Sequence, residues 1–115
     1  MMAAQPDDAG ATLREFNALV NMTPSALEKW LATGESRAVD ITHAGDTESV
    51  GHNSGRRIVE LLRKSPGDLG EADLSFMRKV VGYVHRLLAQ RPAGDVRNTR
   101  WRWSLMNWGH DPLEP

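Results

Sequence analysis

The residues whose types and spacing point most clearly to a chemistry are basic side chains at helical spacing. Four basic side chains fall on one side of the helix expected around them: Arg78, Lys79, His85 and Arg86. Such a row can neutralise the phosphates of a nucleic-acid backbone. Gly82 lies in the middle of this arc, where the missing side chain permits close approach of another backbone or a ligand. Three interpretations stay open: anion binding, packing of a crossing helix, and plain solvated surface.

A second set of cations lies on the polar face of the helix expected to start at residue 54. Its members are Arg56, Arg57, Arg63 and Lys64, with Glu60 three or four residues from each. Pairs at that spacing contribute a few tenths of a kcal/mol, so a self-neutralised solvated face is the favoured interpretation. If the chain binds nucleic acid, we expect the phosphate contacts to come from Arg78, Lys79 and Arg86, with help from Arg56, Arg57 and Arg102.

Three of the four tryptophans lie within eight residues near the C-terminus. Trp101 and Trp108 share one helical face, which predicts that they anchor this end to the core. Trp103 points nearly the opposite way, with Met106 about 60° from it. Burial is the favoured expectation for Trp103. If exposed, Trp103 and Met106 form a partner contact, since an exposed Trp can stack on an unpaired base or anchor a protein interface.

Nothing in the chain predicts catalysis or a metal centre. There are no cysteines, and the four histidines lack the spacing that zinc or iron sites use. For His110 we expect a structural hydrogen bond rather than an acid–base role. No phosphate-binding loop, nucleophile elbow or dinucleotide fingerprint is present. We therefore expect a non-enzymatic protein with no cofactor, no metal and no small-molecule substrate.

Charge is distributed unevenly along the chain. The net charge is −1, but residues 1–50 hold 3 Lys/Arg against 8 Asp/Glu, while residues 51–115 hold 11 against 7. Such asymmetry suggests a polyanionic partner for the second half, or two halves that complement one another. No signal peptide and no apolar run of about 20 residues is present, so we expect a cytoplasmic protein without a membrane contact.

The elements that must position these residues are predicted to be helices throughout. The 115 residues suit one small all-α domain, residues 11–115, of about five helices after a disordered lead at 1–10. A helical hairpin is expected at 12–33, starting at a Thr12 capping box. A flexible polar linker is expected at 34–53, and a basic three-helix portion at 54–108.

The long helix expected at about 71–90 has the strongest periodicity in the chain. Its apolar residues cover about half of its circumference, which predicts packing on two sides and a central position. We expect it to pack against the helix from residue 54, the N-terminal hairpin and the C-terminal helix. That last helix is expected at about 96–108, with Asp95 as its cap.

Several segments together resemble a known family of small bacterial proteins. The matching residues are Asn21-Met22-Thr23, Leu27-Glu28, Trp30-Leu31, Ser54 to Leu62, Met77 to Val81, Trp101-Arg102 and Leu105 to Pro112. They resemble the domain-of-unknown-function 3140 family from Thr12 onward, and Trp-Gly-His-Asp-Pro is the most specific part. Members are sometimes labelled DNA-binding, so the resemblance modestly favours DNA binding. It implies no mechanism and no functional residues.

Taken together, the sequence favours a non-enzymatic DNA-binding protein of low sequence specificity. The alternative is a protein-interaction or homodimerisation module that uses Trp103 and Met106. The two differ in salt dependence, because phosphate contacts weaken steeply as salt rises.

Overall fold

The computed structural model describes residues 6–39 and 50–114. Within these ranges the chain forms six α-helices and one short 3-10 turn, and no strand. They are α1 (Pro6–Leu19), α2 (Pro24–Leu31), α3 (Gly34–Ala38), α4 (Val50–Arg63), η1 (Pro66–Asp68), α5 (Glu71–Leu88) and α6 (Arg100–Asn107). The predicted all-α class is confirmed.

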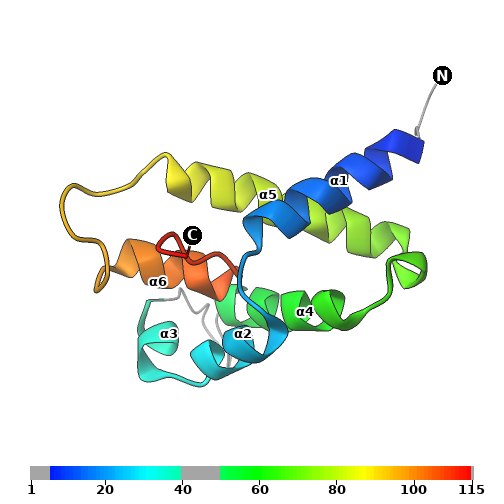
Figure 1. Ribbon diagram of the computed structural model, residues 1–115. Coiled ribbons are helices and arrows are strands. Elements are labelled where there is room, and N and C mark those ends of the chain that lie inside the picture. The colour runs from blue at the N-terminus through cyan, green and yellow to red at the C-terminus, as the bar shows by residue number, and fades with distance from the viewer. Residues whose placement is uncertain (1–5, 40–49, 115) are drawn as a thin grey trace.

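The helices lie in two pairs, with α6 at one end (Figure 1). α1 packs across α5, and α2 runs alongside α4. α6 contacts α2, α4 and α5, and also the short α3. α5 shares a layer with α1, and α6 bridges the two pairs at one end; of the neighbours expected for the long helix, α1 and α6 both contact α5. The N-terminal hairpin is divided between the two pairs, because α1 and α2 bury their apolar faces against different helices.

One core joins both pairs. Five side chains with almost no exposure come from five helices: Phe16, Leu27, Ile58, Met77 and Leu105. Truncating a buried side chain of this size typically costs about 2–5 kcal/mol, a large part of the roughly 5–15 kcal/mol by which a domain is stable. The N-terminal helices α1 and α2 are thus part of the core.

The N-terminal helix begins earlier than predicted. α1 starts at Pro6, and Thr12 is a buried residue inside it rather than its cap. Proline suits the first helical position, because its missing N–H would have no partner there. The predicted disordered lead therefore includes five helical residues, and its first five lie outside the described residues.

The predicted linker is also too long. Thr33 caps α3, because its Oγ1 accepts a hydrogen bond from the Ser36 amide at 3.1 Å. At the other end α4 begins at Val50, so Ser54 lies inside a helix rather than at its start. Residues 40–49 of the linker lie outside the described residues.

The C-terminal helix is shorter than predicted. α6 begins at Arg100, and the Thr99 hydroxyl rather than Asp95 caps it, accepting from the Arg102 amide at 3.2 Å. The Asp95 carboxylate instead accepts from the backbone and guanidinium of Arg97. The preceding segment stays in place because Val96 is buried.

A buried amide joins three helices at the centre. Asn107 of α6 is 0% exposed. Its Oδ1 accepts from Trp30 Nε1 of α2 at 2.6 Å and from the Ser36 hydroxyl of α3. Its Nδ2 donates to the Ser36 carbonyl at 3.0 Å. Gly55 lets α4 come close, since a Cβ there would lie 2.7 Å from the Asn107 carbonyl oxygen.

Candidate nucleic-acid interface

The helix that carries the basic arc is well defined at its start. Asp73, in the first turn of α5, accepts a hydrogen bond from the Gly70 amide at 3.0 Å and an ion pair from Lys64 at 3.0 Å. These contacts lower the pKa of the Asp73 carboxyl from its ordinary value, the amide more than the lysine. Met77, Val80 and Val84 are buried and fix which side of α5 faces solvent.

The opposite side of α5 is an open basic face. Arg78, Lys79, His85 and Arg86 are all exposed, as predicted from their spacing. Gly82 is exposed between them, and a Cβ added there would meet nothing within 4 Å. No element within residues 6–39 and 50–114 crosses α5 at this point, so none of the described helices is the reason for Gly82. We call these five residues the α5 basic face.

Two cations of this face have no acidic partner among the described residues. Among the described residues, Arg78 and Lys79 take part in no ion pair and no side-chain hydrogen bond. The Arg86 guanidinium lies over the Tyr83 ring, 5.8 Å from its centroid. A stacked guanidinium keeps its N–H groups available for a phosphate.

Arg57 and Arg102, by contrast, are engaged within the fold. The Arg57 guanidinium lies 4.4 Å over the Phe76 ring and donates to the Ala72 carbonyl at 3.2 Å, which ties α4 to α5. Arg102 forms a two-bond ion pair with Asp111, at 3.0 and 2.9 Å. Both residues therefore have structural roles that their spacing did not reveal.

Arg56 belongs neither to the α5 basic face nor to the contacts that Arg57 and Arg102 make. Arg56 is exposed on α4 and lines a pocket between α2 and α4. The six residues predicted to bind phosphate thus fall in separate places, and only Arg78, Lys79 and Arg86 lie together.

The tryptophans divide as the helical spacing predicts. Trp108 is 3% exposed and stacks on Tyr83, with ring centroids 4.2 Å apart. Trp101 is half-buried, and its indole N–H donates to the Leu87 carbonyl. Trp103 is half-buried and does not pack against the core, whereas Met106 does, so the favoured expectation that Trp103 is buried in the core is wrong. The most exposed large apolar side chain in the described part of the chain is Leu113, at 41%.

Residues 109–111, which follow α6, form hydrogen bonds with the turn between α1 and α2. We call this set of contacts the C-terminal clamp. The Gly109 carbonyl accepts from the Met22 amide at 3.2 Å. His110 Nδ1 lies 2.6 Å from the Leu19 carbonyl, which confirms the structural hydrogen bond expected for this histidine. Asn21 and Asp111 exchange two hydrogen bonds, at 2.9 and 2.8 Å. The Trp-Gly-His-Asp-Pro segment therefore fixes the C-terminal end of the chain to the turn between α1 and α2.

The charge of Asp111 is maintained inside this clamp. Burial acts to raise the pKa of the Asp111 carboxyl, but hydrogen bonds from Arg102 and from the Leu113 amide outweigh it, so the pKa is lowered. The ionised carboxylate is thus part of the folded state at neutral pH.

No group of three or more His, Cys, Asp or Glu side chains in the described ranges could hold a metal ion. In the same ranges, no helix is long and apolar enough to cross a membrane.

A comparison with protein-family models finds one match. The model described as a protein of unknown function, DUF3140, matches residues 15–106. That range begins within α1 and ends within α6, so it includes the α5 basic face and most of the core. Neither a curated protein nor a solved structure matches the chain.

Proposed function

The chain belongs to the DUF3140 family, whose description assigns no activity, and we propose from the geometry that it is a non-enzymatic protein that binds DNA with low sequence specificity. The contact surface is the α5 basic face, with Arg78, Lys79 and Arg86 on phosphates. The resemblance to a family with members labelled DNA-binding is secondary to this argument.

The observation that carries the proposal is an open row of basic side chains with no acidic partner in the part of the chain that the structure describes. A single basic side chain on a protein surface is well solvated and gains little from one phosphate. Several basic side chains on one helix can contact phosphates of the same nucleic acid, and each contact releases counterions. Gly82 leaves the centre of the row without a side chain, so a sugar–phosphate strand can come close to the helix.

Low specificity is part of the proposal because the cations of the face are assigned to phosphates rather than to base edges. Neither Asn nor Gln, which recognise adenine, occurs within α5, and the Arg and Lys side chains that could read guanine are assigned to the backbone. Phosphate contacts position a protein on the duplex without reading the sequence.

The same geometry limits the affinity. The logarithm of the binding constant falls with the logarithm of salt by about 0.9 per phosphate contact, so three contacts give a slope of about −2.7. Between about 50 and about 200 mM salt the affinity then falls about 40-fold. A net charge of −1 adds no long-range attraction, so the binding depends on this local face.

A matched pair of variants tests the proposal. Arg78→Gln with Lys79→Gln removes two charges from the α5 basic face. Arg14→Gln with Lys29→Gln removes two charges from exposed positions on α1 and α2. Both proteins have the same net charge, so weaker binding to duplex DNA in the first alone supports the proposal. Equal binding by the two folded variants would contradict it.

The protein-interaction alternative has less support. Met106 packs against the core and Trp103 is half-buried, which leaves little apolar area for a second copy. Stable protein interfaces bury about 800 Å² on each partner.

A further inference from the structure

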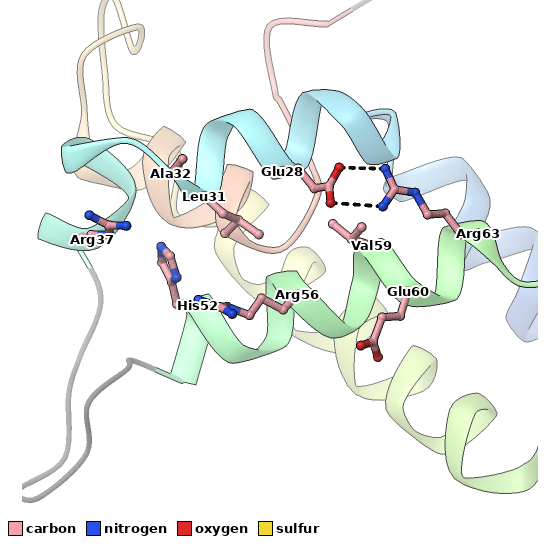
Figure 2. A pocket seen from close by; sticks show the side chains of 9 residues that line it. All are labelled: Glu28, Leu31, Ala32, Arg37, His52, Arg56, Val59, Glu60 and Arg63. Carbon is pink, nitrogen blue, oxygen red and sulfur yellow. Dashed lines mark hydrogen bonds and ion pairs between the residues drawn. The ribbon is translucent and has the colours of Figure 1, made fainter.

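A pocket lies between α2 and α4 (Figure 2). Its volume is about 450 Å³, within the range of small-molecule sites. Residues from α2, α3 and α4 line it, together with Ala32: Glu28, Leu31, Ala32, Arg37, His52, Arg56, Val59, Glu60 and Arg63. None of them comes from α5, so the pocket is separate from the α5 basic face.

An ion pair neutralises one end of this pocket. Arg63 donates to both carboxylate oxygens of Glu28, at 3.0 and 2.7 Å, which lowers the pKa of that carboxyl. Figure 2 shows this pair bridging α2 and α4. The Glu60 carboxylate points away from the other polar side chains in the same view.

The other end gathers cationic and imidazole groups. Figure 2 shows Arg37, His52 and Arg56 together there, from α3 and the first two turns of α4. His52 is 4% exposed and forms the buried wall. His52 and Arg56 each also make a further interaction within the protein, which restrains them, so a ligand would be an additional partner.

The wall between the two ends is apolar. Leu31 from α2 and Val59 from α4 are both buried and line the pocket. A concave site with an apolar wall and a few convergent polar groups is typical of small-ligand binding. Guanidinium groups suit the oxygens of phosphate and carboxylate, to which they can donate two hydrogen bonds.

We propose that this pocket binds a small organic anion, whose phosphate or carboxylate contacts Arg37 and Arg56 and whose short apolar body lies on Leu31 and Val59. The proposal does not depend on DNA binding.

The test is an NMR titration of the full ¹⁵N-labelled chain with three probes. Phenyl phosphate has both the anionic head and an apolar body, inorganic phosphate has the head alone, and benzyl alcohol has the body alone. We expect saturable shifts at Arg37, His52 and Arg56 with phenyl phosphate, and weaker binding of the other two. A benzoate titration tells whether a carboxylate replaces the phosphate.

The variants use one pocket charge and one matched charge beside it. Arg37→Gln should weaken phenyl phosphate binding about tenfold, the equivalent of 1.4 kcal/mol. Lys29→Gln removes a charge from α2 that does not line the pocket, and it should leave binding unchanged. Arg37 is exposed on the short α3, so its replacement leaves the core intact. Arg56→Gln removes the second guanidinium of the proposed site and serves as the second variant.

Three results would overturn the proposal. They are the absence of saturable shifts with phenyl phosphate, shifts confined to α5, and equal binding by Arg37→Gln and the parent. The Arg78→Gln and Lys79→Gln variant separates the two proposals, because it should lose DNA binding and keep the phenyl phosphate shifts.

Discussion

Two glycines with the same backbone conformation offer a sharp test of the C-terminal clamp. Gly94 and Gly109 both have φ of +83°, which L-residues rarely adopt. They differ in the space around them. A Cβ at Gly94 would meet nothing within 4 Å, whereas at Gly109 it would lie 2.9 Å from Val20 Cγ1 and 3.4 Å from Ile58 Cγ2.

The expected costs follow from this difference. Replacing either glycine by alanine strains the backbone by about 1–2 kcal/mol. At Gly109 the alanine also overpacks the contact with the buried Val20 and Ile58, which adds about 1–3 kcal/mol. The Gly109→Ala protein should therefore be less stable than the Gly94→Ala protein by about 1–3 kcal/mol.

Urea unfolding followed by circular dichroism measures both free energies of unfolding against the parent. The Gly94→Ala variant is the control, because it carries the backbone strain without the steric contact. If both variants lose the same stability, Gly109 does not lie against Val20 and the described clamp is incorrect.

The remaining predictions concern α5, the ionised clamp and the tryptophans. Gly82→Ala should raise the free energy of unfolding by about 1 kcal/mol, since the site is an exposed helix interior with open space; a loss of stability would show that something covers Gly82. Asp111→Asn should cost about 2 kcal/mol by breaking charged hydrogen bonds to Arg102, whereas Asp95→Asn, at an exposed pair, should cost clearly less; equal losses would contradict the burial of the clamp. The pKa values of Asp73, Asp95 and Asp111 are lowered, to about 2 for Asp95 by its hydrogen bonds with Arg97. Their stabilisation is complete above the ordinary carboxyl pKa of 3.8 and is lost as the pH falls through the folded values, so urea midpoints should drop below about pH 4, and a flat acid profile would refute this. The Trp103→Ala protein should have the same mass by light scattering as the parent at every concentration; a lower mass would support the interaction alternative.

The sequence predicted the elements whose signals are local. Within the predicted hairpin, α2 begins at a local signal: Thr23 is its N-cap, Pro24 is its first residue, and the Thr23 hydroxyl accepts from the Ala26 amide at 3.1 Å. α5 agrees with its predicted range to within two residues, because its apolar periodicity and acidic first turn act along one helix.

Elements defined by distant partners were not predicted. Ser36 looks like a linker residue, yet it is buried because Asn107, 71 residues away, satisfies its polar groups. Ser54 looks like a cap but lies buried within α4. Burial of polar residues through long-range hydrogen bonds has no periodic signal in the sequence.

The candidate site was partly predicted for the same reason. Arg78, Lys79 and Arg86 share one helix, so their spacing alone places them together. Arg57 and Arg102 were assigned to phosphates because their partners, Phe76 and Asp111, become neighbours only through tertiary structure or a turn.

The measurement that tests the α5 basic face most directly is duplex DNA binding by the purified protein as a function of salt, by fluorescence anisotropy. The parent should give a log–log slope of about −2.7, and the Arg78→Gln, Lys79→Gln and Arg86→Gln triple variant a slope near zero. The same slope in the folded triple variant, or no binding by the parent at about 50 mM salt, would contradict the proposed function.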